Sequence, residues 1–228
     1  MHITGHAYVK LLCKWEFKKQ SFKGVNERPV ELRFVFQNLT NICPRTVLDV
    51  GTGTSALPQL MRMCGYLVTA IDNVQDYWQF GLVNRHYHVI HDDITNSKLK
   101  GPYDVITCVS VLEHIRDYHQ AIRSMFHLLK PGGHLLITFP FNNEKYSQNV
   151  YALPNSSVKE AVPFITQAFS SKDVGVWLDA NNAQIVDQEY WQFFKGEYWT
   201  CGEMIVPPVR VAREDRHQLT CILFQKRP

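Results

Sequence analysis

The 228-residue sequence predicts an α/β fold: a doubly wound, seven-stranded, mostly parallel sheet with an antiparallel last strand, preceded by N-terminal helices. Short apolar runs alternate with segments of helical periodicity between residues 45 and 140, which is typical of parallel strands joined by crossover helices. A tight turn, Gly51-Thr52-Gly53, connects the first run to its helix. Two long apolar runs near the C-terminus have no obvious helix between them, so we expect them to pair antiparallel.

The composition is that of an ordinary globular protein. Hydrophobic residues make up 45% of the chain and charged residues 20%, and the formal net charge is +3. This balance excludes disordered and fibrous classes, and without a localised basic stripe it predicts no nucleic-acid partner. No apolar run approaches the ~20 residues that span a bilayer, and the N-terminus lacks the apolar segment of a signal peptide. We therefore expect no membrane partner.

The six cysteines are scattered and form no C-x-x-C pair. Several lie inside apolar runs, which favours buried, reduced thiols over disulfides or a metal site. The sequence thus predicts a cytoplasmic protein without a bound metal.

The N-terminal segment is predicted to be helical. Apolar residues recur at helical spacing from Leu11 to about Cys43, and Pro44 stops this pattern. We expect residues 1–44 to form a helical cap and residues 45–228 to form the main domain.

Seven apolar runs are predicted as strands, and helices are expected between most of them. The first five runs are residues 46–50, 67–72, 87–93, 103–111 and 134–140, and the last two are residues 183–194 and 219–226. Three helices are expected among these runs. The first passes through Met61 and Met63, the second covers residues 112–130, and the third begins at a cap on Ser170 or Ser171.

The glycine turn could hold several kinds of ligand. A triphosphate-binding loop needs G-x-x-x-x-G-K-[ST], which is absent. The looser dinucleotide fingerprint G-x-G-x-x-A fits Gly51 to Ala56, and Asp72 follows at the expected distance. The chain shows no second nucleotide-binding half, which counts against a nicotinamide-dependent oxidoreductase, although this alternative stays open.

Four motifs in register carry a family resemblance. They are "VLDVGTGTS", "VTAIDNV", "HDDIT", and "YDVITCVSVLEHI" followed by "LLKPGGHLLITFP". Together they resemble the class I S-adenosylmethionine-dependent methyltransferases, in particular the small-molecule branch that includes ubiquinone-biosynthesis enzymes. The resemblance covers roughly residues 45–140 and departs from the family at Ser55, which replaces the third glycine of the turn. It implies a Rossmann-like methyltransferase fold and S-adenosylmethionine as the cofactor.

The resemblance also implies which residues bind the cofactor. Gly51, Thr52 and Gly53 would let the backbone contact its methionine tail, and Asp49 would lie near the ammonium group. Asp72 would accept hydrogen bonds from the ribose hydroxyls. The residues expected around the adenine and beneath the sulfonium are Asn73, Val74, Asp93, Ile94, Cys108 and Val109.

Several of these assignments have structural alternatives. Asp49 could cap the turn, and Asp92 and Asp93 could exchange roles. For Asp72 the ligand role is favoured, because an acid that ends an apolar run just past a glycine turn has little evident structural purpose.

A hydroxyl acceptor benefits from a general base, whereas an amine needs little more than alignment. His114 follows the fourth strand and is the first candidate, against a capping or packing role. Glu113 is expected to act beside it by orienting the backbone or the cofactor. His217 is expected at a strand edge away from the site.

Substrate choice should depend on insertions that the core does not need, at about residues 141–170 and 195–217. Residues expected to contact the acceptor are Tyr146, Tyr198, Trp199 and Arg210. They predict O-methylation of a polar or saccharide-like small molecule. N-methylation of a protein or another macromolecule is the alternative, and a homodimer is one assembly that the sequence leaves open.

Overall fold

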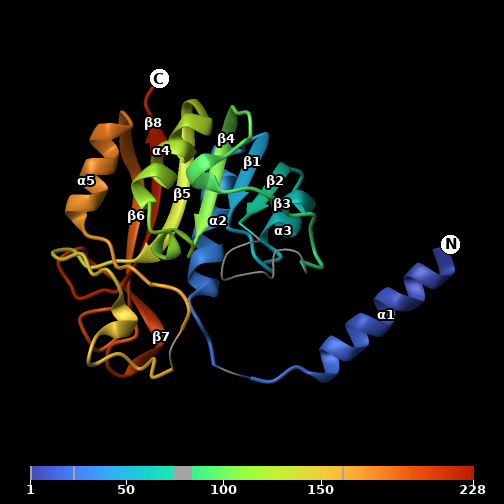
Figure 1. Ribbon diagram of the computed structural model, residues 1–228, viewed down its shortest axis with the longest axis horizontal. Helices are drawn as coiled ribbons and strands as arrows, with labels where there is room; N and C mark the ends of the chain where they lie inside the picture. Colours follow the sequence, from blue (N-terminus) through green and yellow to red (C-terminus); the bar gives the residue numbers. More distant parts are fainter. Residues whose placement is uncertain (1, 23, 74–83, 161) are drawn as a thin grey trace.

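One eight-stranded sheet, with helices on both faces, organises the computed structural model (Figure 1). The structure describes residues 2–22, 24–73, 84–160 and 162–228. The strands are β1 (Thr46–Val50), β2 (Leu67–Asp72), β3 (Ile90–His91), β4 (Tyr103–Val109), β5 (Leu129–Pro140), β6 (Ala183–Phe194), β7 (Met204–Val211) and β8 (Leu219–Lys226). The helices are α1 (His2–Lys18), α2 (Arg28–Ile42), α3 (Leu57–Met63), α4 (Tyr118–Leu128) and α5 (Ser171–Ala180), with short 3₁₀ turns η2 (Ile94–Asn96), η3 (Leu112–His114) and η4 (Val150–Ala152).

The strand order is β3-β2-β1-β4-β5-β8-β6-β7. Strands β1 to β5 pair in parallel. Strand β8 lies between β5 and β6 and is antiparallel to both. The predicted parallel core and the predicted antiparallel pairing of the two C-terminal runs are therefore confirmed.

The described part of the sheet has eight strands rather than the predicted seven, because β7 was missed. This strand contains Pro207 and Pro208, which read in the sequence as a loop. It pairs with β6 at the edge of the sheet, where Trp191 faces Arg210. A proline has no N–H to donate to a neighbouring strand, so an edge strand tolerates it where a central strand does not.

The predicted helix over residues 112–130 is also divided. Residues after β4 first form η3, and α4 begins only after Asp117, whose carboxylate accepts a hydrogen bond from the N–H of Gln120 at 3.1 Å. The third strand is limited to β3 rather than residues 87–93. Of the two predicted caps, Ser170 and Ser171, the structure has Ser170, which forms a capping box with Asp173.

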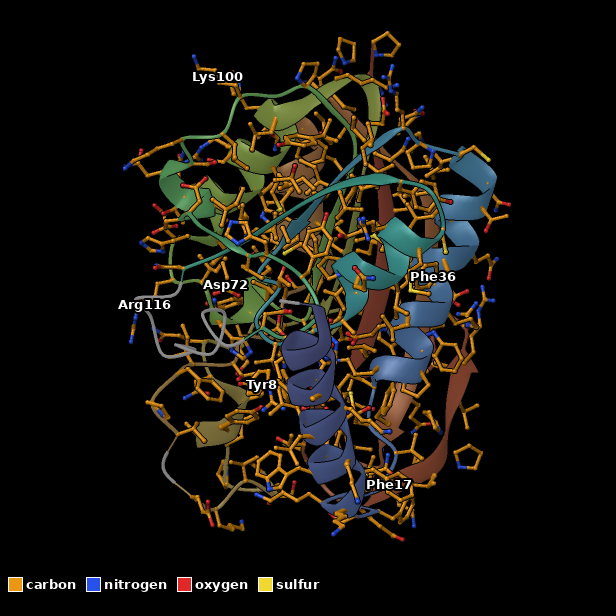
Figure 2. The ribbon with its side chains drawn as sticks, turned by 90° about the vertical axis from the view of Figure 1, so that its right-hand side faces the viewer. Tyr8, Phe17, Phe36, Asp72, Lys100 and Arg116 are labelled. Carbon is orange, nitrogen blue, oxygen red and sulfur yellow. The ribbon has the colours of Figure 1, made fainter. Side chains whose placement is uncertain are left out.

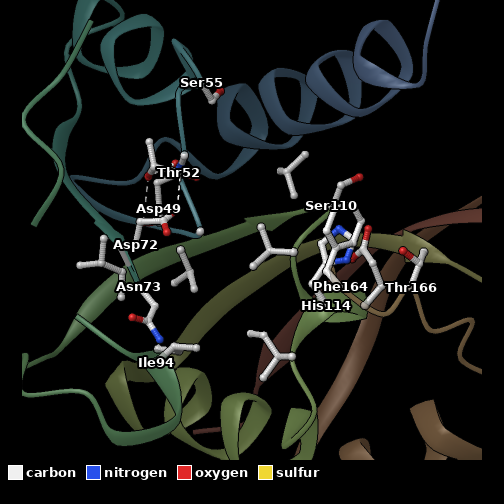
Figure 3. Close-up of a pocket in the computed structure, with 18 of the residues that line it drawn as sticks. Asp49, Thr52, Ser55, Asp72, Asn73, Ile94, Ser110, His114, Phe164 and Thr166 are labelled. Atoms are coloured by element: carbon white, nitrogen blue, oxygen red, sulfur yellow. Dashed lines mark hydrogen bonds between the residues drawn. The ribbon is translucent and has the colours of Figure 1, made fainter. Parts of the chain in front are cut away.

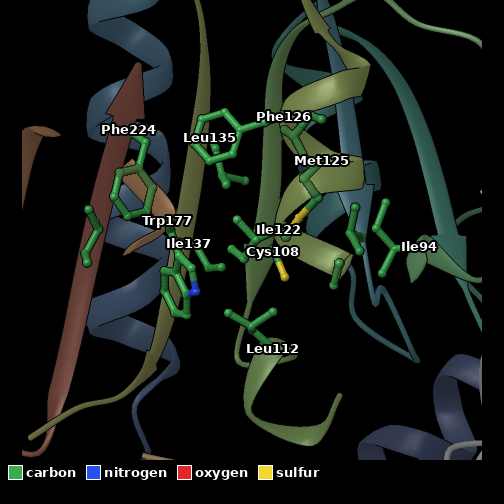
Figure 4. Close-up of a cluster of buried hydrophobic side chains, with 14 of the residues drawn as sticks. Ile94, Cys108, Leu112, Ile122, Met125, Phe126, Leu135, Ile137, Trp177 and Phe224 are labelled. Atoms are coloured by element: carbon green, nitrogen blue, oxygen red, sulfur yellow. The ribbon is translucent and has the colours of Figure 1, made fainter. Parts of the chain in front are cut away.

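Each face of the sheet is covered by a separate layer of apolar side chains. Helices α4 and α5 pack on one face, where the cluster drawn in Figure 4 includes Cys108, Leu112, Ile122, Met125, Trp177 and Phe224. Helices α2 and α3 pack on the other face, against Val47, Val105, Leu136 and Leu223. Consecutive residues such as Val105 and Ile106 belong to opposite layers, because successive side chains of a strand alternate between faces.

The two N-terminal helices differ in their surroundings. Helix α1 projects away from the sheet, and Tyr8 and Phe17 on it are 63% and 72% exposed (Figures 1 and 2). Helix α2 belongs to the core, since Phe34 and Leu39 are fully buried in the layer beneath the sheet. The expected cap thus contains one core helix and one projecting helix. In the described part of the chain, no helix combines the length and apolar character needed to cross a membrane.

Asp104 joins the beginning of β1 to the beginning of β4. Its Oδ2 accepts hydrogen bonds from the N–H groups of Arg45 and Thr46, each at 2.8 Å, and its Oδ1 lies 2.5 Å from Nζ of Lys130. Desolvation raises the pKa of Asp104, but these bonds outweigh it and hold the pKa at about 2. The carboxylate is therefore a stability determinant at neutral pH.

We predict that Asp104→Asn lowers the free energy of unfolding by about 1 kcal/mol at pH 7, because the carboxylate is partly exposed and its bonds are screened. The folded-state pKa of Asp104 lies below its reference value of 3.8, so the stabilisation is present above pH 4 and is lost as the pH falls toward 2. Urea unfolding of both proteins along this pH range measures it. The exposed Asp179→Asn on α5 is the matched control; an equal loss in both variants would contradict the prediction.

Candidate functional site

A cavity of about 860 Å³ opens at the carboxyl ends of β1, β2 and β4 (Figure 3). Strand β2 lies on one side of β1 and β4 lies on the other, so the strand order reverses at β1. Open parallel sheets bind their ligands at such a switch point. One part, which we call the glycine arm, is lined by residues 49–55, 71–73 and 92–95. The other, the aromatic arm, is lined by Glu27, Arg28, Leu32, Glu113, His114, Ile115, Arg116, Asp117, Tyr151, Phe164, Ile165, Thr166 and Trp199.

The glycine turn has the backbone conformation that its sequence predicts. Gly51 and Gly53 both have positive φ angles, of 74° and 53°. The N–H of Gly51 donates to the carbonyl of Ile71 at 2.9 Å, and the N–H of Gly53 donates to Oδ2 of Asp72 at 2.6 Å. Asp72 therefore fixes the turn to the end of β2. This corrects the expectation that its carboxylate has little structural purpose.

Asp49 lies beneath the turn and is almost fully buried. Its two carboxylate oxygens accept hydrogen bonds from the hydroxyls of Thr52 and Thr107, both at 2.6 Å. Burial raises the pKa of Asp49 to about 6, although both hydroxyls lower it. The side chain is thus held in one orientation, with its charge compensated by hydroxyl dipoles.

Residues expected at the adenine also line the glycine arm. Asn73 and Ile94 line the cavity, and Ile94 supplies an apolar surface there. Asp93 lines it too, while its Oδ1 accepts bonds from the N–H and hydroxyl of Thr95 at 2.9 and 2.8 Å. Val74 lies outside the described residues.

One predicted cofactor residue is misplaced. Cys108 is fully buried in the apolar layer under α4 and does not line the cavity, whereas its neighbour Val109 does. The alternation of side chains along β4 explains the difference, because adjacent residues point to opposite faces. Burial also raises the pKa of the Cys108 thiol well above its usual range.

Helix α2 contributes a charged network that the motif analysis missed. Glu31 is fully buried, and its Oε1 accepts hydrogen bonds from the hydroxyls of Ser110 and Thr138, both at 2.6 Å. Its Oε2 accepts a bond from Nη1 of Arg28 at 2.8 Å. Ser110 has a φ of 50°, a strained conformation for a residue with a side chain. The network therefore joins α2 to the ends of β4 and β5 and places the Arg28 guanidinium in the cavity wall.

A sequence signal for Glu31 did exist. The buried residues of α2 include Glu31, Phe34, Val35 and Asn38, which are spaced as one face of a helix. An acid on an otherwise apolar helix face must find donors in the folded protein, so its position indicates a buried polar site.

Glu113 and His114 follow β4, as the fourth motif predicts, and lie in η3 in the wall of the aromatic arm. Glu113 is 3% exposed, and its Oε2 has no hydrogen-bond partner among the described residues. Burial raises the pKa of this carboxyl group to about 8, and the charge of Glu31 adds to the rise. Nδ1 of His114 lies 2.7 Å from the carbonyl oxygen of Ile165, and its ring meets Phe164 edge-on.

The structure brings one of the four predicted acceptor contacts to the cavity. Trp199 lines the aromatic arm and packs against Phe193 and Phe194. Tyr146, Tyr198 and Arg210 do not line it.

Two of the displaced side chains have structural partners instead. The hydroxyl of Tyr146 donates to Gln167 at 2.6 Å, and Arg210 pairs with the buried Glu189 at 3.1 Å. Both partners are distant in the sequence and are brought to these side chains only by folding. His217 stacks on Phe141 outside the cavity, in agreement with its predicted role away from the site.

The sequence matches a family model described as "Methyltransferase domain" over residues 26–188. The chain is 30% identical over 140 residues to the ubiquinone biosynthesis O-methyltransferase of Serratia proteamaculans, an alignment covering 58% of each chain. It is 29% identical to the enzyme of that name from Pseudomonas fluorescens, over 63% of this chain and 65% of the relative. The alignments thus span less than two thirds of these relatives.

The fold is also found in solved structures. One is the 1,6-didemethyltoxoflavin-N1-methyltransferase of Burkholderia thailandensis, whose structure contains S-adenosylhomocysteine. It superposes with a TM-score of 0.58 at 15% identity, covering 98% of this chain and 90% of that one. At this identity, the likeness shows the fold alone.

We predict that Gly51→Ala is more destabilising than Gly53→Ala. Both glycines have positive φ, so either alanine costs roughly 1–2 kcal/mol of backbone strain. A Cβ at Gly51 would lie 2.4 Å from both γ-carbons of Val111, whereas at Gly53 the nearest atom, Oδ2 of Asp72, is 3.9 Å away. We expect the clash to add about 1–3 kcal/mol in Gly51→Ala.

Urea unfolding of the two variants and the wild type measures the difference in their free energies of unfolding. Equal losses would mean that the ends of β1 and β4 are not packed as closely as described.

Proposed function

The chain belongs to the methyltransferase domain family, among the class I S-adenosylmethionine-dependent enzymes, and we propose that it transfers the cofactor's methyl group to a hydroxyl group of a small molecule. The observation that carries this proposal is the two-armed cavity. Its glycine arm suits the cofactor, and its aromatic arm provides room for an acceptor beside the strand ends.

The residues of the glycine arm fit the chemistry of S-adenosylmethionine. The cofactor carries an ammonium, a carboxylate, a ribose diol and an adenine. Asp49 offers a carboxylate for the ammonium, and Asp72 lies at the end of β2 for the diol. Arg28, from the aromatic arm of the same cavity, offers a guanidinium for the carboxylate. Asp93 and Ile94 offer an acceptor and an apolar surface for the adenine. The charged groups of the cavity thus match those of the ligand.

Methyl transfer from a sulfonium is an in-line displacement, so the protein mainly supplies alignment and excludes water. When bound, the cofactor supplies an electrophilic methyl group. The aromatic arm aligns the acceptor, and the apolar surfaces of Phe164 and Trp199 exclude water there.

His114 is the candidate general base. Its Nδ1 faces the carbonyl of Ile165, which requires a proton on Nδ1 and leaves Nε2 as the basic nitrogen. A hydroxyl group loses its proton as the bond to carbon forms, and Nε2 can receive it.

The lining of the aromatic arm favours a ring-bearing acceptor. Tyr151, Phe164 and Trp199 provide flat apolar surfaces, while His114 and Thr166 provide polar contacts. Three of the four residues that suggested a saccharide, Tyr146, Tyr198 and Arg210, lie outside the cavity, so we propose a small phenol-like molecule instead. The names of the O-methyltransferase relatives support a hydroxyl acceptor.

We predict that Asp72→Asn weakens binding of S-adenosylhomocysteine about 10–100-fold, as expected for the loss of a charged hydrogen-bond acceptor. Asparagine can retain the bond from Gly53 through its side-chain oxygen, so this variant tests the ligand role more sharply than alanine. Calorimetric titration measures the affinity, with NAD titrated in parallel. Binding of NAD in place of S-adenosylhomocysteine would contradict the proposed function.

We predict that His114→Ala lowers kcat by roughly 10²–10⁴ while the affinity for S-adenosylhomocysteine changes by less than about threefold, because the histidine acts on the acceptor. The assay follows S-adenosylhomocysteine formation with a panel of small phenols, catechol among them. His217→Gln changes a buried histidine outside the cavity and is the matched control. Turnover of amines that is insensitive to His114→Ala would favour N-methylation.

A further inference from the structure

His114, whose ring lines the cavity (Figure 3), is held from two sides by one short segment of the chain. Nδ1 of the ring faces the carbonyl oxygen of Ile165 at 2.7 Å. Two residues further on, Gln167 contacts the main chain on both sides of the histidine. Its Nε2 donates hydrogen bonds to the carbonyl oxygens of Glu113 at 3.2 Å and of Ile115 at 2.9 Å. The same segment thus fixes both the ring and the backbone of His114.

The 3₁₀ turn η3 depends on these bonds. Its own two hydrogen bonds, each 3.0 Å long, end at the carbonyl oxygens of Val111 and Leu112. The carbonyl oxygens of Glu113 and Ile115 are therefore left to other donors, and Gln167 supplies them. Its main-chain N–H also donates to Glu113, at 3.0 Å. Because a 3₁₀ turn has poor hydrogen-bond geometry of its own, the bonds from Gln167 fix how η3 lies in the cavity wall.

The side-chain amide of Gln167 has a defined orientation. A carbonyl oxygen accepts hydrogen bonds and cannot donate them, so the NH₂ group must face η3. The amide oxygen then faces Tyr146, whose hydroxyl donates to it at 2.6 Å. Burial raises the pKa of Tyr146, so this hydroxyl keeps its proton at neutral pH. Gln167 is only 2% exposed, so little water competes for these bonds.

The segment that carries Gln167 is itself anchored. Its neighbour Ala168 exchanges two main-chain hydrogen bonds with Ser147, each at 2.9 Å, and the carbonyl of Thr166 accepts the N–H of Val150 at 2.8 Å. The chain runs antiparallel on the two sides of the bridge between Ser147 and Ala168. These bonds give the Gln167 amide a fixed base from which to hold η3.

Neither Gln167 nor Tyr146 lines the cavity, so each acts on a ligand only through other residues. The contacts run from the Tyr146 hydroxyl through the Gln167 amide to the backbone on both sides of His114. A general base must lie within hydrogen-bond reach of the proton that it removes, and a displacement of ~1 Å can lower a rate roughly 100-fold. A side chain that fixes the backbone of the base therefore affects the rate without contacting the acceptor.

We propose that Gln167, oriented by Tyr146, is a positioning residue for His114. It holds the imidazole ring against the carbonyl of Ile165, so that Nδ1 keeps its proton and Nε2 stays the basic nitrogen. This inference rests on the proposed function, in which His114 is the general base. Tyr146, which the sequence analysis expected to contact the acceptor, acts on the reaction through Gln167 instead.

NMR of the whole chain, labelled with ¹⁵N at histidine, tests the proposal without an acceptor. Long-range ¹H–¹⁵N spectra distinguish the two neutral tautomers, and the signals of His114 are those that His114→Ala lacks. At about pH 8.5, where an ordinary histidine is neutral, we expect the wild type to carry the proton on Nδ1. Gln167→Met keeps the size of the side chain but removes the amide, and we expect it to show a mixture of tautomers.

Turnover of the small phenols gives the second readout. Gln167→Met should lower kcat roughly 10–100-fold, while the affinity for S-adenosylhomocysteine changes by less than about threefold, because no group of the glycine arm is altered. Tyr146→Phe removes one hydroxyl from a ring that is 39% exposed, so this milder variant tests the proposal even if Gln167→Met does not fold. It should lower kcat by roughly 3–10-fold, as expected for one hydrogen bond.

Two variants are matched controls. Gln218 is also a fully buried glutamine, and its amide oxygen accepts the N–H groups of two successive residues of β6 at 3.0 Å each. Tyr66 carries a hydroxyl that donates to the carbonyl of Leu39 at 3.3 Å. Neither side chain lines the cavity. Gln218→Met and Tyr66→Phe should therefore leave the His114 proton on Nδ1, and Tyr66→Phe should keep the wild-type kcat.

Three results would overturn the inference while leaving the proposed function intact. They are an Nδ1 proton retained in Gln167→Met, an equal change of tautomer in Gln167→Met and Gln218→Met, and a wild-type kcat in Tyr146→Phe. Full turnover of the phenols by His114→Ala would instead contradict the proposed general base, and this inference with it.

Discussion

The constraint on which the site depends is the burial of several carboxyl groups at one edge of the sheet. Glu31, Asp49 and Glu113 are all at least 97% buried there. Low-dielectric surroundings make an unpaired carboxylate costly, so each group needs donors, a cation or a proton. Glu31 has two hydroxyls and Arg28, Asp49 has two hydroxyls, and Glu113 has its proton. Asp49 and Glu113 line the cavity, and Glu31 supports its wall through Ser110 and Arg28, so the wall is rich in acidic groups, which suits a cationic cofactor.

Strands β1, β2, β4 and β5 of the parallel core could be predicted from sequence because each contains a short, nearly continuous apolar run, which is typical of strands covered on both faces. Prediction failed where the place of a segment in the folded domain decided its structure against its local sequence pattern. The two prolines of β7 indicate a loop until an edge position makes their missing donors harmless. The helix over residues 112–130 looked continuous because its apolar spacing continues through η3, whereas the Asp117 cap divides it.

The two arms of the cavity differ in how far the sequence reveals them. The glycine arm comes from strand ends and the residues that follow them, so local motifs place its residues, with Cys108 displaced only by strand alternation. The aromatic arm combines α2, η3 and the insertions, which meet through long-range packing. Its aromatic side chains cannot be distinguished from core rings by sequence. Of the predicted acceptor contacts, Trp199 therefore lines the cavity whereas Tyr146 does not.

The position of β8 has a consequence for the order in which the domain can assemble. This strand follows β6 and β7 in the chain, yet it lies between β5 and β6 in the sheet. During synthesis, β6 and β7 leave the ribosome before the strand that joins them to the parallel core exists. In a nascent chain, the edges of β5 and β6 that pair with β8 in the folded domain therefore stay unpaired until residues 219–226 emerge. The folding of this domain is in that respect completed late, by a strand inserted into the middle of the sheet.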